Sequence, residues 1–399
     1  MSFAAVLANH DFRRLWLVGT LSSMGRWLDT LAFAIVAYQQ SGSPFVVAML
    51  SMLRMLPMGL CGPLLATFAD RVQRRTVFLA AIGLNLAMAI GLMLLSASGR
   101  LAIWHLAVAA FVNGMSWTAE NTVRRVNLGE LVGSEALPRA TSLDAASANA
   151  ARMLGPTAGG VFLATVGITG AFGLGMALYV VSLLAMLGYR YQHRLGGGVT
   201  QSTFSRLIEG FSLARRSPKL VGTLVITVIF NLWGWPVTAM VPVLAQGQLG
   251  LGPEATGLLV SLDGLGALLA AVLVGWLVTT RWHGTVYAVS VGSYGVLSVG
   301  LALSHHVLPA GLAILLSGAA SAGFGIMQTT LTYLAAPPDL RGRAFGVLAL
   351  CIGLAPLGFV HLGMLADATS SATATMMVGA EGVGALALTW RWWRAVLVG

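Results

Sequence analysis

The sequence predicts an all-α polytopic membrane protein, and three observations support this fold class. Of the 399 residues, 57% are hydrophobic and only 9% are charged, whereas a soluble protein of this length needs far more charge to cover its surface. Apolar runs of 18 residues or more recur along the chain, each long enough to cross a hydrocarbon core of ~30 Å as a helix. Alternating segments of roughly ten residues, which are typical of a membrane β-barrel, are absent from the sequence.

The apolar runs predict twelve transmembrane helices. Arg13 and Arg14 lead into a first span that is too long and too charged for the apolar part of a cleavable signal peptide. Cys61 and Cys351 both fall inside spans, so we expect them to pack and not to form a disulfide. The expected spans are residues 15–38, 44–68, 77–97, 101–123, 139–165, 168–189, 219–245, 254–279, 285–304, 308–333, 343–366 and 372–390.

The net charge of +10 is explained by the distribution of the 23 Lys and Arg residues. Most of them fall at every second inter-span connection, and the opposite set of loops holds only Arg100. Because cytoplasmic loops are enriched in Lys and Arg, both termini are expected in the cytoplasm. We therefore expect a bilayer as the partner of the basic surface, and no nucleic acid. The basic connections contain Arg13, Arg14, Arg71, Arg74, Arg75, Arg124, Arg125, Arg139, residues 190–219, Arg281, Arg341, Arg343, Arg391 and Arg394.

The longest polar segment, residues 190–218, divides the chain into an N-terminal half (1–189) and a C-terminal half (219–399) of six spans each. Its later part is a possible interfacial helix, with an apolar side that includes Phe204 and Phe211. The halves resemble a degenerate repeat, because "GSPFVVAMLSML" aligns with "LGPEATGLLVSL" and "RATSLDAASANAARMLGP" aligns loosely with "RGRAFGVLALCIGLAPLG". Two similar halves suggest a transporter whose site lies between them at mid-membrane.

Ionisable residues inside spans are the candidate functional residues, since each costs at least ~2.5–3.5 kcal/mol at the bilayer centre. In span 1, Arg26 and Asp29 lie on one helical stripe with Ser22 and Phe33. Arg26 and Asp29 are close enough in sequence to pair. Span 4 carries Asn113, Trp117, Glu120 and Arg124 at the same spacing. The remaining spans add Arg54, Asp144, Asn149, Arg152, Asp263 and Glu381.

Each of these groups has a functional and a structural interpretation. A carboxylate such as Asp29 that alternates between dry and wet surroundings can carry a proton, but a static bridge to Arg26 explains it too. Glu120 is expected either to titrate or to form a gate bridge with Arg124, and for Asp144 a structural role is favoured. Asp263 and Glu381 remain open. Arg54 and Arg152 are expected to bind an anionic substrate or to pair with Asp29, Asp144 or Asp263.

Two later spans offer aromatic and weakly polar surface. Pro236 and Gly234 are expected to kink span 7, where Asn231, Trp233 and Trp235 either line a cavity or anchor at the interface. Span 10 adds Gln328 and Tyr333. His305 and His306 are expected in solvent, and His361 is expected to be a hydrogen-bonded core residue. No metal site and no cofactor are predicted.

The residues resemble the major facilitator superfamily. "GPLLATFADRVQRR" is similar to its signature between spans 2 and 3, with Ala66 and Gln73 where the family favours Gly and with Arg26 where the first span commonly carries an acid. "NHDFRRLWLVGTLSSMGRWLDTLAFAIVAYQQSGSP", "TVRRVNLGELVGSEALPRATSLDAASANAARMLGPTAGG" and "PPDLRGRAFGVLAL" are similar to the branch of enterobactin-exporter-like and macrolide-efflux-like carriers. The resemblance spans residues 9–399. It implies alternating access, usually proton-coupled export of a small amphipathic compound, with spans 1, 4, 7 and 10 lining the cavity.

Two further motifs take their meaning from this resemblance. Asp70 and Arg71 are expected to latch the cytoplasmic side against the start of span 11, where Arg341 and Arg343 are partners, while Arg74 and Arg75 contact headgroups or fix topology. "RMLGPTAGG" at 152–160 resembles an antiporter signature: Gly155, Gly159 and Gly160 admit another helix closely, and Pro156 bends the span.

The sequence therefore predicts a proton-coupled secondary exporter for a drug or siderophore-like metabolite, a monomer in the bacterial inner membrane. Import, or transport of a lipid or organic anion, is an alternative, and a transport-inactive sensor or scaffold is another. An enzyme is not expected, because there is no nucleophile–base or metal-ligand constellation and no GxxxxGK[ST] loop.

Overall fold

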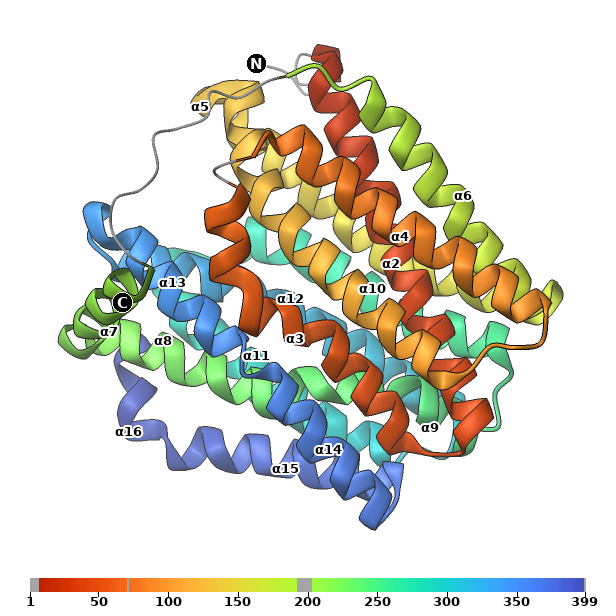
Figure 1. Ribbon diagram of the computed structural model, residues 1–399. Coiled ribbons are helices and arrows are strands. Elements are labelled where there is room, and N and C mark those ends of the chain that lie inside the picture. The colour runs from red at the N-terminus through yellow and green to blue at the C-terminus, as the bar shows by residue number, and fades with distance from the viewer. Residues whose placement is uncertain (1–6, 70–71, 192–202, 398–399) are drawn as a thin grey trace.

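A computed structural model describes residues 7–69, 72–191 and 203–397, and within these ranges every regular element is a helix (Figure 1). In this part of the chain, eight segments are long and apolar enough to cross a membrane. Each expected span is helical, and the seventh and eleventh are each divided among more than one helical element. The helices before the linker are α2 (His10–Ser41), α3 (Pro44–Ala69), α4 (Arg74–Ala97), α5 (Ile103–Thr165) and α6 (Gly167–Leu187).

The polar segment at residues 190–218, which we call the linker, contains the linker helix α7, and the chain continues from there with more frequently interrupted elements. They are α7 (Thr203–Arg216), α8 (Pro218–Ile229), η1 (Phe230–Gly234), η2 (Trp235–Ala239), α9 (Val241–Gly247), α10 (Pro253–Leu277), η3 (Thr280–Trp282), α11 (His283–Ala302), α12 (Val307–Ala335), η4 (Pro338–Leu340), α13 (Arg341–Ile352), α14 (Ala355–Ala368), α15 (Ser371–Leu388), α16 (Trp390–Trp393) and η5 (Arg394–Val396).

Local sequence sets the limits of several helices. The Asn9 side chain accepts hydrogen bonds from the backbone N–H groups of Asp11 and Phe12, which caps the start of α2. At its other end Gly42 adopts a left-handed conformation with φ of 64°, which ends the helix. Ser217 caps α8 in the same way as Asn9 caps α2, and Pro218 occupies the first turn, where its missing N–H is not needed.

The connection between the fourth and fifth spans differs from the expectation. Residues 124–138 are helical and belong to α5, and the direction changes at Gly133, whose φ is 71° and ψ 169°. A glycine reaches this conformation without strain, so the chain reverses with a single non-helical residue. Pro156 does not interrupt the helix, because Gly133 is the only residue of α5 with non-helical φ and ψ.

The seventh span is interrupted, as Gly234 and Pro236 predicted. It runs from α8 through the π-helical turn η1 and the 3₁₀ turn η2 into α9. Pro236 lacks an N–H and cannot continue the α-helical ladder. Stacked aromatic rings pack against the break. The ring centroids of Phe230 and Phe324 are 3.9 Å apart, and those of Phe324 and Tyr287 are 5.4 Å apart. The Trp235 ring lies 6.3 Å from the Phe230 ring, measured between centroids, and so packs beside this stack.

The two sets of helices meet along two seams, α5 with α10 and α3 with α14. In Figure 1 both sets converge toward the lower right, where α2 and α4 end and α10 begins. We call this the far end, and we call the end where α2, α4 and α13 begin the basic end. At the far end the Gln39 amide donates to the Gln246 side-chain oxygen at 3.2 Å.

Glycines allow the close approach along both seams. A Cβ on Gly160 would lie 2.6 Å from the Pro253 carbonyl oxygen, and one on Gly264 would lie 2.5 Å from the Met153 backbone nitrogen. Across the other seam, a Cβ on Gly59 would lie 2.7 Å from the Gly353 carbonyl oxygen. Small residues thus allow backbone contact between the halves, as expected for Gly160.

Replacing Gly264 with Ala is predicted to destabilise the protein, because the new methyl group meets backbone atoms of α5. The expected loss is about 1–3 kcal/mol of unfolding free energy, the usual cost of overpacking, measured as a lower midpoint of thermal unfolding in detergent. Gly275→Ala is the matched control in the same helix, since a Cβ there meets no atom within 4 Å. Equal midpoints for the two variants would contradict the assignment of a tight seam.

Candidate transport cavity

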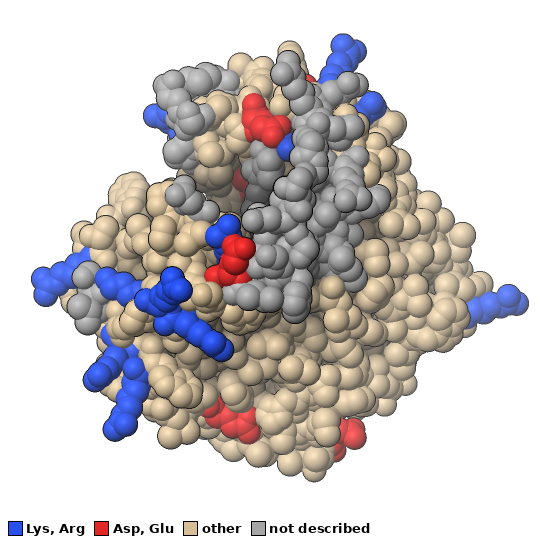
Figure 2. Space-filling model, turned by 60° about the vertical axis from the view of Figure 1, so that its left-hand side comes forward, with Lys and Arg blue, Asp and Glu red and all other residues tan. Residues whose placement is uncertain are grey.

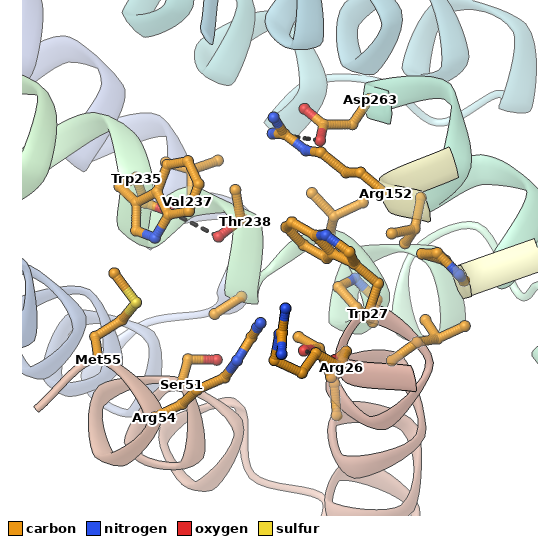
Figure 3. A pocket seen from close by; sticks show the side chains of 18 of the residues that line it. Arg26, Trp27, Ser51, Arg54, Met55, Arg152, Trp235, Val237, Thr238 and Asp263 are labelled. Carbon is orange, nitrogen blue, oxygen red and sulfur yellow. Dashed lines mark hydrogen bonds and ion pairs between the residues drawn. The ribbon is translucent and has the colours of Figure 1, made fainter. Parts of the chain in front are cut away.

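A cavity of about 340 Å³ lies where the two sets of helices meet, and both sets line it. Figure 3 shows Arg26 and Trp27 from α2 and Arg54 from α3 facing Trp235 from η2, Arg152 from α5 and Asp263 from α10. The volume is within the usual range of small-molecule sites. In Figure 2 the surface is hollowed between the upper and lower parts of the molecule, on the side that is on the left in Figure 1.

One ion pair crosses the seam inside the cavity. Arg152 of α5 lies 2.5 Å, nitrogen to oxygen, from the Asp263 carboxylate of α10, and both side chains are largely buried. Arg152 also donates to the Ser321 hydroxyl of α12 at 3.3 Å. The sequence offered Asp263 as one of three possible partners for Arg152, and the structure selects it. This ion pair therefore connects helices from the two sides of the linker at the cavity wall.

Arg26 pairs with Glu120, not with Asp29, so the expected pairing within span 1 is wrong. Its guanidinium donates to the Glu120 carboxylate at 2.6 Å and to the Ser23 hydroxyl at 2.9 Å. Arg26 is 5% exposed and Glu120 3% exposed. Because α2 packs along α5, the long Arg26 side chain reaches across to the next helix, while Asp29 points elsewhere.

Asp29 lies behind the cavity wall and not on it. Its carboxylate accepts a hydrogen bond from the Tyr179 hydroxyl of α6 at 2.8 Å and a longer one from the Asn113 amide at 3.4 Å. The side-chain oxygen of Asn113 in turn accepts from Arg54 Nε at 3.2 Å. Asn113 therefore stands between the Asp29 carboxylate and the Arg54 guanidinium.

Arg26 lines the cavity as expected, but the rest of the predicted stripe on span 1 was out of register by one residue. Ser23, Trp27, Thr30 and Ala34 of α2 line the cavity, whereas Asp29 and Ser22 lie inside the helix bundle. The cavity residues that the sequence analysis missed have the same helical spacing as the predicted stripe, but the series begins at Ser23. Charge alone selected the wrong face, because a buried acid can bind groups inside its own half. Trp117 of α5 lines the cavity as expected, with Asn121 and Asn149.

Arg124 does not bridge to Glu120, which corrects the expected gate bridge in span 4. It forms an ion pair with Asp144, the residue for which a structural role was expected. Both lie in α5, on either side of the reversal at Gly133, so the pair fastens the two arms of that helix. The guanidinium fills the space above Gly19 of α2.

Before the linker, Asp29, Asn113, Glu120 and Arg124 were assigned to the cavity from the sequence and do not line it. After the linker, the same holds for three further residues. The Asn231 amide donates to the Thr227 carbonyl oxygen at 2.9 Å, and Gln328 donates to the Thr227 hydroxyl at 3.2 Å. Trp233 donates to the Glu381 carboxylate at 2.9 Å, and this carboxylate also lies 2.7 Å from His361 Nε2. The π turn redirects the helix face, so that Trp235, Thr238 and Val241 line the cavity in their place.

The expected cytoplasmic latch falls partly outside the described residues, because Asp70 and Arg71 are not among them. Arg341 stacks on the Tyr333 ring and donates to its hydroxyl at 2.6 Å. Arg343 pairs with Glu209 of α7 at 2.7 Å, which fastens the linker helix to α13. Both arginines therefore have partners on their own side of the seam.

Arg74 and Arg75 contact protein groups, where headgroup or topology roles were expected. Arg74 donates to both oxygens of Glu130 at 2.6 and 2.9 Å and to the Asn127 side chain at 2.7 Å. Arg75 donates to the Leu187 carbonyl oxygen at 2.8 Å. These bonds connect the start of α4 to α5 and α6. Among the described residues, no group of three or more His, Cys, Asp or Glu side chains is placed to hold a metal ion.

Comparison with known proteins identifies the family. A family model described as transmembrane secretion effector, a group within the major facilitator superfamily, matches residues 1–392. The chain belongs to this family. It is a membrane transporter and not an enzyme, and the fold class predicted from the sequence is confirmed.

Characterised and uncharacterised relatives match most of the chain. An uncharacterised MFS-type transporter, YfiS of Bacillus subtilis, is 27% identical over 90% of this chain and 88% of its own. The multidrug efflux pump Tap of Mycolicibacterium fortuitum is 24% identical over 86% of each chain. The enterobactin exporter EntS of Salmonella typhimurium is 29% identical over 76% of this chain and 74% of its own.

Solved structures confirm the fold at low identity. A POT family transporter in complex with 5-aminolevulinic acid superposes with a TM-score of 0.77 at 12% identity and covers 96% of both chains. A bacterial homologue of the lysosomal transporter Spinster has a TM-score of 0.67 at 12% identity, covering 97% of this chain and 95% of that one. Both likenesses concern the architecture alone.

Glu120→Gln is predicted to destabilise the protein strongly, because Arg26 is left as an unpaired buried cation. Removing one partner of a buried pair typically costs about 3–5 kcal/mol. The unfolding midpoint in detergent measures the effect. Replacing both residues with Met is expected to recover part of the loss, since no uncompensated charge then remains.

Glu130→Gln is the control for this variant. Glu130 is paired with Arg74 but is more exposed, with 36% of its side chain accessible, so the expected cost is only about 0–1 kcal/mol. A loss for Glu120→Gln no larger than that for Glu130→Gln would show that Arg26 does not depend on its partner.

Proposed function

We propose that this family member is a bacterial inner-membrane secondary exporter that moves a small amphipathic compound by alternating access, driven by protons. The carrying observation is the central cavity, walled by residues from both sides of the linker and crossed by one ion pair. Relatives described as a multidrug efflux pump, a macrolide efflux protein and an enterobactin exporter support export of such compounds.

The direction of opening follows from where the two halves touch. The close glycine contacts run from the middle of α5 and α10 to the far end, where Gln39 also bonds to Gln246. The hollow in Figure 2 is on the side of the basic end. With the basic end in the cytoplasm, as the distribution of arginines favours, this state opens inward and is ready to take substrate from the cell.

Asp263 is the proposed proton-binding carboxylate. It lines the cavity, unlike Asp29 and Glu120, and its partner Arg152 lies on the opposite side of the seam. A proton on Asp263 removes the charge that attracts Arg152. The contact between α5 and α10 is then weaker at the position of this pair. Proton binding is thereby linked mechanically to the rocking of the halves. Asp29, the carrier expected from the sequence, is the second candidate.

Asp263→Asn is predicted to abolish transport driven by a pH gradient in proteoliposomes and to leave substrate exchange without a gradient. An amide cannot release a proton, so the step that couples the gradient to the cycle is lost. The measurement is gradient-dependent movement of a panel of fluorescent lipophilic compounds. Asp367→Asn, at an exposed position near the end of α14, is the matched control and is expected to retain full activity.

The outcomes separate the parts of the proposal. If Asp263→Asn keeps full gradient-driven transport and Asp29→Asn loses it, the proton-binding role belongs to Asp29. Movement by the unmodified protein that does not respond to any pH gradient would reject proton coupling. Accumulation in the direction opposite to export would favour the importer alternative.

A further inference from the structure

The cavity wall carries more positive than negative charge. Three guanidinium groups, those of Arg26, Arg54 and Arg152, reach it from three helices, and Asp263 is the one carboxylate among its described lining residues. Arg152 is neutralised by Asp263, and Arg26 by Glu120, which lies behind the wall. Arg54 remains as the third cation.

Arg54 has no carboxylate within ion-pair distance among the described residues. Its Nε donates to Asn113, and its two terminal nitrogens have no protein acceptor there. The nearest acid in this network, Asp29, is already bonded to Tyr179 and to the amide of the same Asn113. In Figure 3 the Arg54 and Arg26 side chains lie side by side with their tips in the cavity.

Because Glu120 neutralises Arg26, the uncompensated charge in the cavity is that of Arg54, and a bound anion offsets this charge strongly where the dielectric constant is low. Guanidinium is planar, always charged, and presents paired N–H groups that match a carboxylate, sulfonate or phosphate. The free terminal nitrogens of Arg54 are the part of that group a ligand can reach. A cationic ligand at the same place adds a further positive charge and is disfavoured.

Aromatic side chains flank the same cations. Trp27 lies with its ring 5.4 Å from the Arg54 guanidinium carbon and 5.4 Å from that of Arg152. Trp235 lies 5.7 Å from Arg152 on the other side of the cavity. With Trp117, these rings offer flat apolar surface to the ring of a ligand. The volume of about 340 Å³ suits one small molecule and not a long chain.

We propose that the cavity binds an aromatic organic anion, with its acid group on the terminal nitrogens of Arg54 and its rings against Trp27 and Trp235. This inference rests on the proposed function and names the substrate class. An acid that binds there also lies near Arg26 and Arg152, so it competes with Glu120 and Asp263 for their cations. Substrate binding and the ion pair across the seam are then coupled through Arg152.

The test compares two fluorescent probes that share a ring system. Anilinonaphthalene sulfonate carries an anionic group, and phenylnaphthylamine is its neutral analogue. Binding of each to the full chain in lipid nanodiscs is measured with empty nanodiscs subtracted. We expect the sulfonate to bind about tenfold or more tighter than the neutral probe, the effect of one charge-assisted hydrogen-bonded contact.

Arg54→Gln is expected to weaken sulfonate binding by about tenfold or more and to change binding of the neutral probe by less than about twofold. Arg54→Lys keeps the positive charge but lacks the paired N–H groups of guanidinium, so it should retain part of the preference for the sulfonate probe. Arg100→Gln, at an exposed position at the far end, is the matched control and should bind both probes like the unmodified protein.

Equal binding of the two probes by the unmodified protein would overturn the inference, and this comparison needs no variant to fold. Equal loss of both probes in Arg54→Gln, with the unfolding midpoint unchanged, would overturn it as well. Sulfonate binding that depends on Arg54, in a protein that shows no gradient-driven transport, would support this site and reject the proposed proton-coupled export. Gradient-driven transport without any preference for the anion would do the reverse.

Discussion

The ion pair between Arg152 and Asp263 is the interaction on which the account of this transporter depends. It joins α5 to α10 at the wall of the cavity, at a nitrogen–oxygen distance of 2.5 Å. Charges removed from water attract strongly but are costly to leave unpaired. Any event that neutralises one partner, or offers the other a new one, therefore changes how firmly the halves are held. In the mechanism that we propose, a proton acts on Asp263 and an anionic ligand acts on Arg152.

The surrounding structure keeps this pair in place. Gly264, next to the pair, and Gly160, toward the far end, let the α5 and α10 backbones approach closely. Trp27 and Trp235 cover the Arg152 guanidinium from both walls, and the interrupted seventh span places Trp235 there. Before the linker, Glu120 neutralises Arg26 and the Tyr179 hydroxyl donates a hydrogen bond to Asp29, so both side chains are held by partners on their own side of the seam. Cross-seam charge and internal charge are thus separate networks.

The sequence predicted the spans, the break near Pro236 and the helix-packing glycines, because these depend on local hydropathy and on single-residue backbone chemistry. It did not predict the pairing of charges. Arg26 and Asp29 are three residues apart, yet each binds a residue on another helix. Which face of α2 meets the cavity depends on the rotation of a helix within the bundle. A shift of one residue along α2 exchanges Asp29 for Thr30 at the cavity wall, and charge content alone does not resolve that.

The most direct test of the central claim is the separation of the two halves at the far end. Cysteines introduced at Ser43 and Leu249, in a variant without Cys61 and Cys351, carry the spin labels. Pulsed electron paramagnetic resonance in nanodiscs then measures the distance between the two labels. We expect one short distance at neutral pH and a second, longer population in Asp263→Asn or at acidic pH. An unchanged distance distribution in Asp263→Asn would contradict the claim that the Arg152–Asp263 pair holds the halves together.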